Sequence, residues 1–244
     1  MAGHSKWANI RFRKGAQDAK RGKIFTKLIR EISVAARAGG ADESSNSRLR
    51  DAVSKALKAN MKRDTIDNAI KRGVGGLDGA NMVEMRYEGY GPGGVAVLVD
   101  CLSDNKNRTV SEVRHAFTKH GGNLGTDGSV SYLFTKQGEI LLTQDAPQEK
   151  AMELAIEAGA DDVVLDEGQL EIITAADNYH AVLAALQKEG YPVEQSQLTM
   201  RAQTMIPLDK ESTESLLKLI DMLEDLDDVQ DVHSNAEFPD SLFE

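Results

Sequence analysis

The most concentrated chemistry in this sequence is a run of basic side chains near its N-terminus. Between His4 and Arg30 the chain carries nine lysines and arginines against a single acid, Asp18. Ammonium and guanidinium groups bind phosphates by displacing condensed counterions, and an aromatic ring can stack on a base. The segment therefore predicts a nucleic-acid-binding arm. Its expected contact residues are Lys6, Trp7, Arg11, Arg13, Lys14, Lys20, Arg21, Lys23 and Lys27.

A solvated, disordered tail is the alternative interpretation of this segment. Trp7, which is the only tryptophan of the chain, lies among the charges together with Ile10 and Phe12, and a tail without a function has no reason to keep them. We expect residues 4 to about 22 to order on their target. Lys23, Lys27 and Arg30 are expected on the outer face of the first helix.

The charge of the chain is divided unevenly along its length. Residues 1–80 hold 18 Lys and Arg against 8 Asp and Glu, whereas residues 81–244 hold 11 against 31, within a net charge of -10. This division indicates that the basic part meets a polyanion, while the acidic remainder stays away from it or faces other partners. An acidic protein can therefore still bind nucleic acid.

A glycine-rich loop, Gly-Tyr-Gly-Pro-Gly-Gly at residues 89–94, formally matches the dinucleotide fingerprint. That fingerprint needs a helix after its last glycine, but here a β-branched run follows, so a hairpin loop is the favoured interpretation. Glycines leave backbone amides accessible to phosphate. We therefore predict a second nucleic-acid contact at Tyr90, Gly91 and Gly93.

The remaining polar residues do not predict catalysis, a cofactor or a metal site. The chain has no phosphate-binding loop, no nucleophile elbow and no HExxH motif, and its five histidines are scattered. The carboxylates between Glu224 and Asp231 are interpreted as a solvated face, and the segment 104–109 as a helix start capped by Asn107. We expect a non-enzymatic protein.

Three helices are predicted to carry the arm, over residues 23–38, 44–61 and 63–72, because apolar residues recur there at helical spacing. Glycines at 73–79 predict a flexible linker after them. From residue 82 the apolar period changes to two, and two strands separated by the glycine loop predict a hairpin.

Two β-α-β units follow from the pattern of the remaining chain. One has strands at 95–102 and 129–135 around a helix at 107–120, and the other has strands at 197–206 and 229–236 around a helix at 210–226. Residues 138–195 between them show the order β-α-β-β-α-β, which is ferredoxin-like.

The predicted fold is therefore α+β and multidomain: an N-terminal three-helix domain plus two ferredoxin-like α+β domains, one inserted in the other. The expected division is 1–79, 80–136 with 197–244, and 137–196. We expect an acidic cleft between domains that holds Asp161, Asp162, Asp166 and Glu167.

Several stretches resemble the YebC family, which includes the PmpR branch and mitochondrial translational activators. They are AGHSKWANI, NMKRDTIDNAIKRG, YEGYGPGGVAVLVDCLSDNKNRT and FTKHGGNLG with GSVSYLF. The resemblance implies three domains and a non-enzymatic cytoplasmic protein. It also implies two different functions: a DNA-binding transcriptional regulator, or a translation factor that assists difficult peptide-bond formation at the ribosome, as in proline-rich stretches.

The residues favour RNA over DNA. None of the three predicted helices shows a recognition face of Arg, Asn or Gln for base edges, whereas a basic arm and an exposed glycine loop suit structured RNA. The expected partner is nucleic acid, DNA or ribosomal RNA, with the ribosome itself as a candidate. The chain is expected to be a monomer with no membrane or small-molecule partner, and its single Cys101 agrees with a reducing compartment. The alternative is a protein-interaction adaptor that uses the acidic domains.

Overall fold

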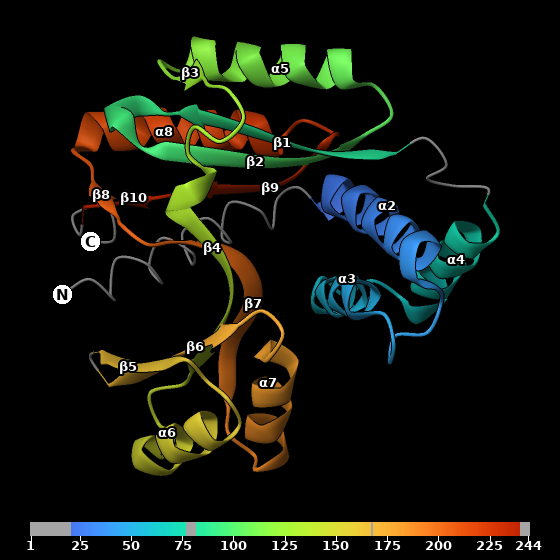
Figure 1. The fold of residues 1–244 in the computed structure, drawn as a ribbon, viewed down its shortest axis with the longest axis vertical. Coiled ribbons are helices and arrows are strands. Elements are labelled where there is room, and N and C mark those ends of the chain that lie inside the picture. Colours follow the sequence, from blue (N-terminus) through green and yellow to red (C-terminus); the bar gives the residue numbers. More distant parts are fainter. Residues whose placement is uncertain (1–20, 77–81, 167, 240–244) are drawn as a thin grey trace.

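The computed structural model describes residues 21–76, 82–166 and 168–239. It has three parts, which Figure 1 shows as helices α2, α3 and α4 at one side, a sheet with α5 and α8 above, and a sheet with α6 and α7 below. Within these ranges no helix is both long enough and apolar enough to cross a lipid bilayer. The α+β multidomain fold predicted from the sequence is confirmed.

The N-terminal part is a small helical unit. Its helices are α2 (Arg21–Gly39), α3 (Ser47–Lys58) and α4 (Arg63–Val74). The Asn46 side chain caps α3 by accepting a hydrogen bond from the Leu49 N–H at 3.0 Å, which satisfies one of the free amides of the first turn. Apolar residues of the three helices form one core, which includes Ile32, Leu49, Val53, Ile66 and Ile70.

Gly73 lies within α4 and serves packing, although the sequence suggested a helix end there. A Cβ at this position would lie 2.2 Å from the backbone oxygen of Ser33, so only glycine lets α4 approach α2 this closely. Linker residues 77–79 fall outside the described residues.

The upper part is a four-stranded antiparallel sheet with the order β3-β1-β2-β9. Its elements are β1 (Val83–Tyr90), the 3-10 turn η2 (Pro92–Gly94), β2 (Ala96–Ser103), α5 (Lys106–Lys119), β3 (Asn123–Leu124), α8 (Lys210–Glu224) and β9 (Val229–Ser234). The predicted hairpin is β1 with β2. Helices α5 and α8 cover one face, where Val97, Val99, Phe117, Leu216 and Leu219 are buried together.

The lower part has the predicted ferredoxin-like order. It comprises β4 (Phe134–Leu142), α6 (Gln148–Glu157), β5 (Asp162–Asp166), β6 (Gln169–Ala175), α7 (Tyr179–Lys188) and β7 (Val193–Ala202). The strands form a second antiparallel sheet in the order β5-β6-β4-β7. Helices α6 and α7 pack on one face of it, against Ile140, Leu142, Leu170 and Ile172.

Strands β4 and β7 form a pair that extends from the lower sheet to β2 of the upper sheet. Two strands predicted from the sequence differ from this pair. The expected strand 129–135 is the 3-10 turn η3 (Ser131–Leu133) followed by the start of β4, and the expected strand 197–206 is largely part of β7. Phe134 and Met200 at the upper end of this pair pack against Ala96 and Leu98 on the second face of β2. The suggested divisions at residues 136 and 196 thus fall inside continuous strands. A short parallel pair, β8 (Ile206–Pro207) with β10 (Ala236–Glu237), completes the described chain.

Candidate nucleic-acid interface

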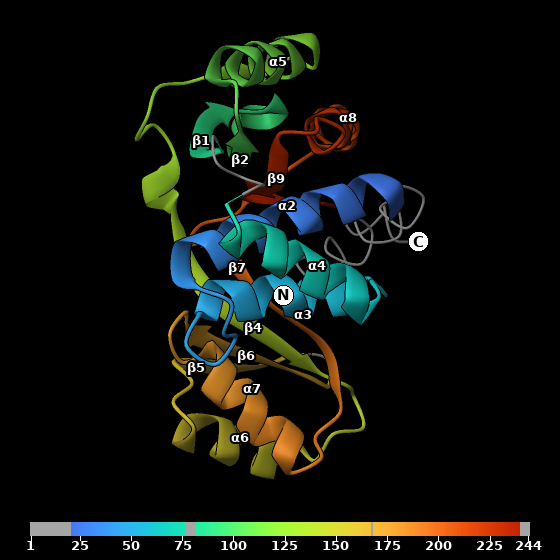
Figure 2. The ribbon, with the colours of Figure 1, turned by 90° about the vertical axis from the view of Figure 1, so that its right-hand side faces the viewer.

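Most of the predicted arm lies outside the described residues. This applies to Lys6, Trp7, Arg11, Arg13, Lys14 and Lys20, and also to the side chain of Arg21, whose backbone starts α2. The structure therefore locates the base of the arm. Figures 1 and 2 together show α2 to one side of the two sheets, at a height between them, with α3 and α4 beside it.

The basic residues at the base of the arm contact the acidic part of the same chain. Lys23 Nζ donates to the carbonyl oxygen of Asp225 at 3.0 Å, and Lys27 Nζ to that of Glu224 at 2.6 Å. Arg30 Nη1 donates to the carbonyl oxygens of Leu102 and Asp227 at 3.1 and 3.0 Å. The sequence predicted these three residues on the outer face of the first helix. In the structure this face of α2 packs on the turn between α8 and β9, so it is not simply an outer face.

The contact has a clear electrostatic basis. The last carbonyl groups of a helix have no partner within the helix and carry its partial negative charge, so cations stabilise that end. Burial lowers the pKa of Lys27 below its ordinary value, although Glu224, Asp231 and Asp227 act in the opposite direction. Lys23, by contrast, is half exposed, and its Nζ also lies 3.8 Å from Asp225 Oδ1. Any phosphate at the base of the arm would compete with these contacts.

Asp228 organises the turn on which α2 rests. Its side chain is 3% exposed and accepts hydrogen bonds from Ser103 Oγ at 2.8 Å, Thr109 Oγ1 at 2.9 Å and Arg108 Nη2 at 2.8 Å. Burial alone would raise the pKa of Asp228, but Arg108, Ser103 and Thr109 hold it below its ordinary value. The predicted solvated face is therefore wrong at this residue.

The start of α5 is built on the same network. Asn105 caps the helix, since its side chain accepts from the Arg108 N–H at 3.1 Å; the sequence suggested Asn107 for this role.

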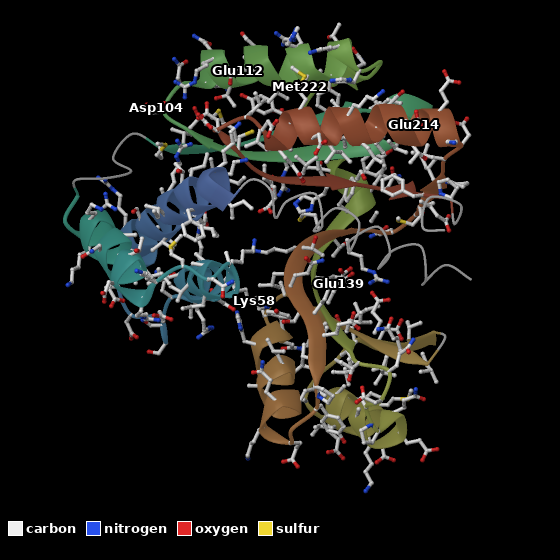
Figure 3. The ribbon with its side chains drawn as sticks, turned by 180° about the vertical axis from the view of Figure 1, so that it is seen from behind. Lys58, Asp104, Glu112, Glu139, Glu214 and Met222 are labelled. Atoms are coloured by element: carbon white, nitrogen blue, oxygen red, sulfur yellow. The ribbon has the colours of Figure 1, made fainter. Side chains whose placement is uncertain are left out.

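A pocket of about 620 Å³ lies here between α2, α5 and the α8–β9 turn, and Figure 3 labels Asp104 and Glu112 at this end of α5. Its lining comprises Lys23, Arg30, Met82, Asp104, Arg108, Glu112, Asp225, Leu226, Asp227 and Asp228.

Of the four acids expected in a cleft between domains, the structure describes the side chains of two. Both are exposed: Asp162 begins β5, the edge strand of the lower sheet, and Asp161 precedes it. The side chains of Asp166 and Glu167 are outside the described part. The acids of the pocket come instead from segments far apart in the sequence, so spacing along the chain gave no signal for it.

The glycine loop is a hairpin turn, as the sequence favoured, and only part of it is accessible. Tyr90 is 40% exposed, and its hydroxyl donates to the carbonyl oxygen of Ser129 at 3.2 Å. Gly93 is exposed with φ of +75°, a conformation that favours glycine. Gly91 is buried, and a Cβ there would lie 2.9 Å from Leu216 Cδ1. Tyr90 and Gly93 thus remain candidate contacts, whereas Gly91 serves packing.

Two exposed lysines and a histidine that the sequence did not bring together lie beside this loop, with Glu214 and Asp221 one helical turn from Lys218 on α8. Lys119 and His115 are exposed one helical turn apart at the end of α5, and Lys218 is exposed on α8. Burial and the charges of these three residues lower the pKa of His120. The loop is close, because a Cβ at residue 122 would meet the backbone oxygen of Tyr90 at 2.7 Å. Lys218 is about 100 residues from α5 in the sequence, so only the fold could bring these residues together.

Metal-ligating residues do not gather in the described ranges: no group of three or more His, Cys, Asp or Glu there has a geometry that could hold an ion. Cys101 is buried on β2, and burial raises the pKa of its thiol to about 12, which leaves it protonated at neutral pH.

Known proteins resemble this chain over its whole length. It is 76% identical to a probable transcriptional regulatory protein of Legionella pneumophila (strain Philadelphia 1), with 100% of this chain and 99% of the relative covered. It is 62% identical to a probable transcriptional regulatory protein of Thioalkalivibrio sulfidiphilus, with 100% and 98% covered. The crystal structure of a conserved hypothetical protein from Aquifex aeolicus matches with a TM-score of 0.77 and 49% identity, over 91% of this chain and 92% of that one.

Two family models match the chain in succession. The model of the TACO1/YebC N-terminal domain matches residues 5–76, and that of the TACO1/YebC second and third domain matches residues 82–236. Because these models and relatives cover nearly the whole chain, the protein belongs to the TACO1/YebC family.

Proposed function

We propose that this chain is a non-enzymatic regulator of gene expression that binds nucleic acid through its basic arm. The observation that carries the proposal is the charge division: residues 4–20 hold five lysines and arginines against one acid, on a chain with a net charge of -10. Phosphate neutralisation is the use to which such a segment is best suited. The names of the relatives, which describe probable transcriptional regulatory proteins, agree with a role in gene expression.

We further propose that the target is structured RNA, with the ribosome as its setting. A DNA reader places an exposed helix in the major groove. Here Lys27 and Arg30 of α2 are engaged by the α8–β9 turn, so this helix does not offer a free recognition face. The charge of the arm, together with exposed Tyr90, Lys119 and Lys218, suits recognition by shape and stacking. In that role the protein would assist the ribosome where peptide bonds form with difficulty, as in proline-rich stretches.

Salt dependence tests the role of the arm. The variant in which Lys6, Arg11, Arg13, Lys14 and Lys20 are replaced by Gln removes five positive charges and leaves every described residue unchanged. If all five contact single-stranded RNA, they contribute about 3.5 to the slope of log K against log salt, so affinity falls about a hundredfold between about 50 and 200 mM salt. The variant should lose that part of the slope.

The matched control replaces five exposed basic residues outside the arm and α2, at Lys62, Lys71, Lys136, Lys150 and Lys188, by Gln. It has the same change in net charge. Equal losses in both variants, or a wild-type affinity that salt does not change, would reject the arm as the binding element. Comparing ribosomal RNA with duplex DNA of equal length in the same assay decides between the two targets.

A further inference from the structure

The helical unit formed by α2, α3 and α4 contacts both sheets through basic side chains. Beyond the contacts of α2 with the α8–β9 turn, Lys55 Nζ of α3 lies 3.7 Å from Asp231 Oδ2 of β9. Lys58 Nζ donates to the carbonyl oxygen of Ser196 on β7 at 2.9 Å, and Figure 3 labels Lys58 at this place. We call the five residues that make these contacts the docked basic side of the helical unit: Lys23, Lys27, Arg30, Lys55 and Lys58.

The helical unit is joined to the sheets by polar contacts and has its own apolar core. That core draws on residues 25–70 alone, and none of the apolar clusters in the described ranges combines residues of the helical unit with residues of a sheet. The two sheets, by contrast, share a cluster in which Phe134 and Met200 pack on Ala96 and Leu98. Domains move relative to one another where their interface is not large and apolar. The structure therefore favours movement of the helical unit as one body.

The docked contacts are of a kind that phosphates can replace. The partners in the Lys23–Asp225 and Lys55–Asp231 pairs are all about half exposed, and exposed ion pairs contribute little stability because water screens them. Lys27 is bound to a carbonyl group at the end of α8, where the helix offers about half a negative charge. A nucleic-acid phosphate offers a full charge, and a strand offers several in a row.

We propose that the docked basic side is a second phosphate-binding surface, which the α8–β9 turn, β9 and β7 cover in the free protein and which nucleic acid uncovers by displacing them. This inference rests on the proposed function, because it concerns how the same nucleic acid is held. The helical unit then turns away from the sheets with its core intact, and Lys23 and Lys27 become able to bind phosphate, as the sequence predicted. Contacts to phosphates position a nucleic acid without reading its sequence, so opening does not make α2 a base-reading helix.

Distances between pairs of spin labels test the opening in the whole chain. The reporting pair is Asn68→Cys on α4 with Ser111→Cys on α5, and the control pair is Ser111→Cys with Lys150→Cys on α6; all three positions are exposed. Cys101 is buried with its thiol protonated, so it does not take up label. Ribosomal RNA should lengthen the distance of the reporting pair and leave that of the control pair unchanged.

The salt dependence of RNA binding tests whether the uncovered side contacts phosphate. If Lys55 and Lys58 both do so, Lys55→Gln with Lys58→Gln lowers the slope of log K against log salt by about 1.4, which is about sevenfold in affinity between about 50 and 200 mM salt. The matched control, Lys62→Gln with Lys71→Gln, removes two exposed charges elsewhere on the helical unit and should keep the wild-type slope.

The outcomes separate this inference from the proposed function. RNA that binds without changing the distance of the reporting pair would overturn the inference alone, and so would a wild-type slope in the variant of Lys55 and Lys58. An equal change in the control pair would also overturn it, because the two sheets would then have separated as well. RNA that does not bind at all would overturn the proposed function, and this inference with it.

Discussion

Replacing Asp228 by Asn should destabilise the protein substantially, although the substitution changes few atoms. The carboxylate is 2% exposed as a residue and accepts from Ser103, Thr109 and Arg108, with Arg30 Nη1 at 3.4 Å. An amide keeps one acceptor oxygen, and its NH₂ group would face Arg108 and Arg30, which can only donate, or hydroxyls that would have to turn their protons away.

The magnitude follows from these contacts. Loss of a buried, charge-assisted acceptor that leaves its donors unsatisfied costs about 1.5 to 3 kcal/mol. Arg108 is partly exposed and can turn to water, which places the expected loss for Asp228→Asn at about 2 kcal/mol. Urea unfolding followed by circular dichroism measures it, with midpoints compared because a chain of several domains need not unfold in one step.

Asp227→Asn is the matched control. Its side chain is exposed one residue away and loses the same charge, so the effect should stay within about 0.5 kcal/mol. The pKa of Asp228 is lower in the folded than in the unfolded chain, so its contribution is present above about pH 4 and is lost as the pH falls through the folded pKa. The variant should therefore show a smaller loss of stability in acid. Equal midpoints for the two variants would refute the buried network.

Three further substitutions test other parts of the structure. Glu88→Gln should cost about 2 kcal/mol in urea unfolding, because Glu88 accepts three backbone N–H groups at 2.7 to 2.8 Å, and a cost below about 0.5 kcal/mol would contradict this. Gly89→Ala should lower the melting temperature by several degrees, since its Cβ would lie 2.6 Å from the backbone oxygen of Asn123; an unchanged melting temperature would show that β3 can move away. Burial alone would raise the pKa of Asp100, but hydrogen bonds such as that from His233 hold it at about 2, so its contribution to stability is lost only as the pH falls from about 4 toward 2. Asp100→Asn should remove that loss, and identical acid denaturation curves would contradict the assignment.

The helices and the ferredoxin-like series could be predicted because their signals are local. Apolar residues at helical spacing located α2, α3 and α4, and the change to a period of two located β1 and β2. The glycine loop was correctly separated from a dinucleotide site because a strand, not a helix, follows it.

The strand boundaries around Gly138 could not be predicted, because its neighbour is distant in sequence. A strand at 129–135 and a separate first strand of the series over residues 138–195 were expected. In the structure Gly138 lies inside β4, and a Cβ there would lie 2.5 Å from the ring of Tyr179. The glycine lets α7 pack close to the sheet.

The surroundings of the candidate site could not be predicted either, for the same reason. The basic face of α2 is visible in the sequence, but the carbonyl groups of Glu224 and Asp225 that Lys27 and Lys23 contact are about 200 residues away. Charge along the chain identifies residues that can bind phosphate. It does not show which of them the fold already engages.

Crosslinking in cells, followed by sequencing of the attached nucleic acid, tests the central claim most directly. Ribosomal RNA should be recovered with the wild-type protein and lost when Lys6, Arg11, Arg13, Lys14 and Lys20 are replaced by Gln. Recovery of specific promoter fragments without ribosomal RNA would contradict the RNA target. Recovery that is equal in the wild type and the arm variant would contradict binding through the arm.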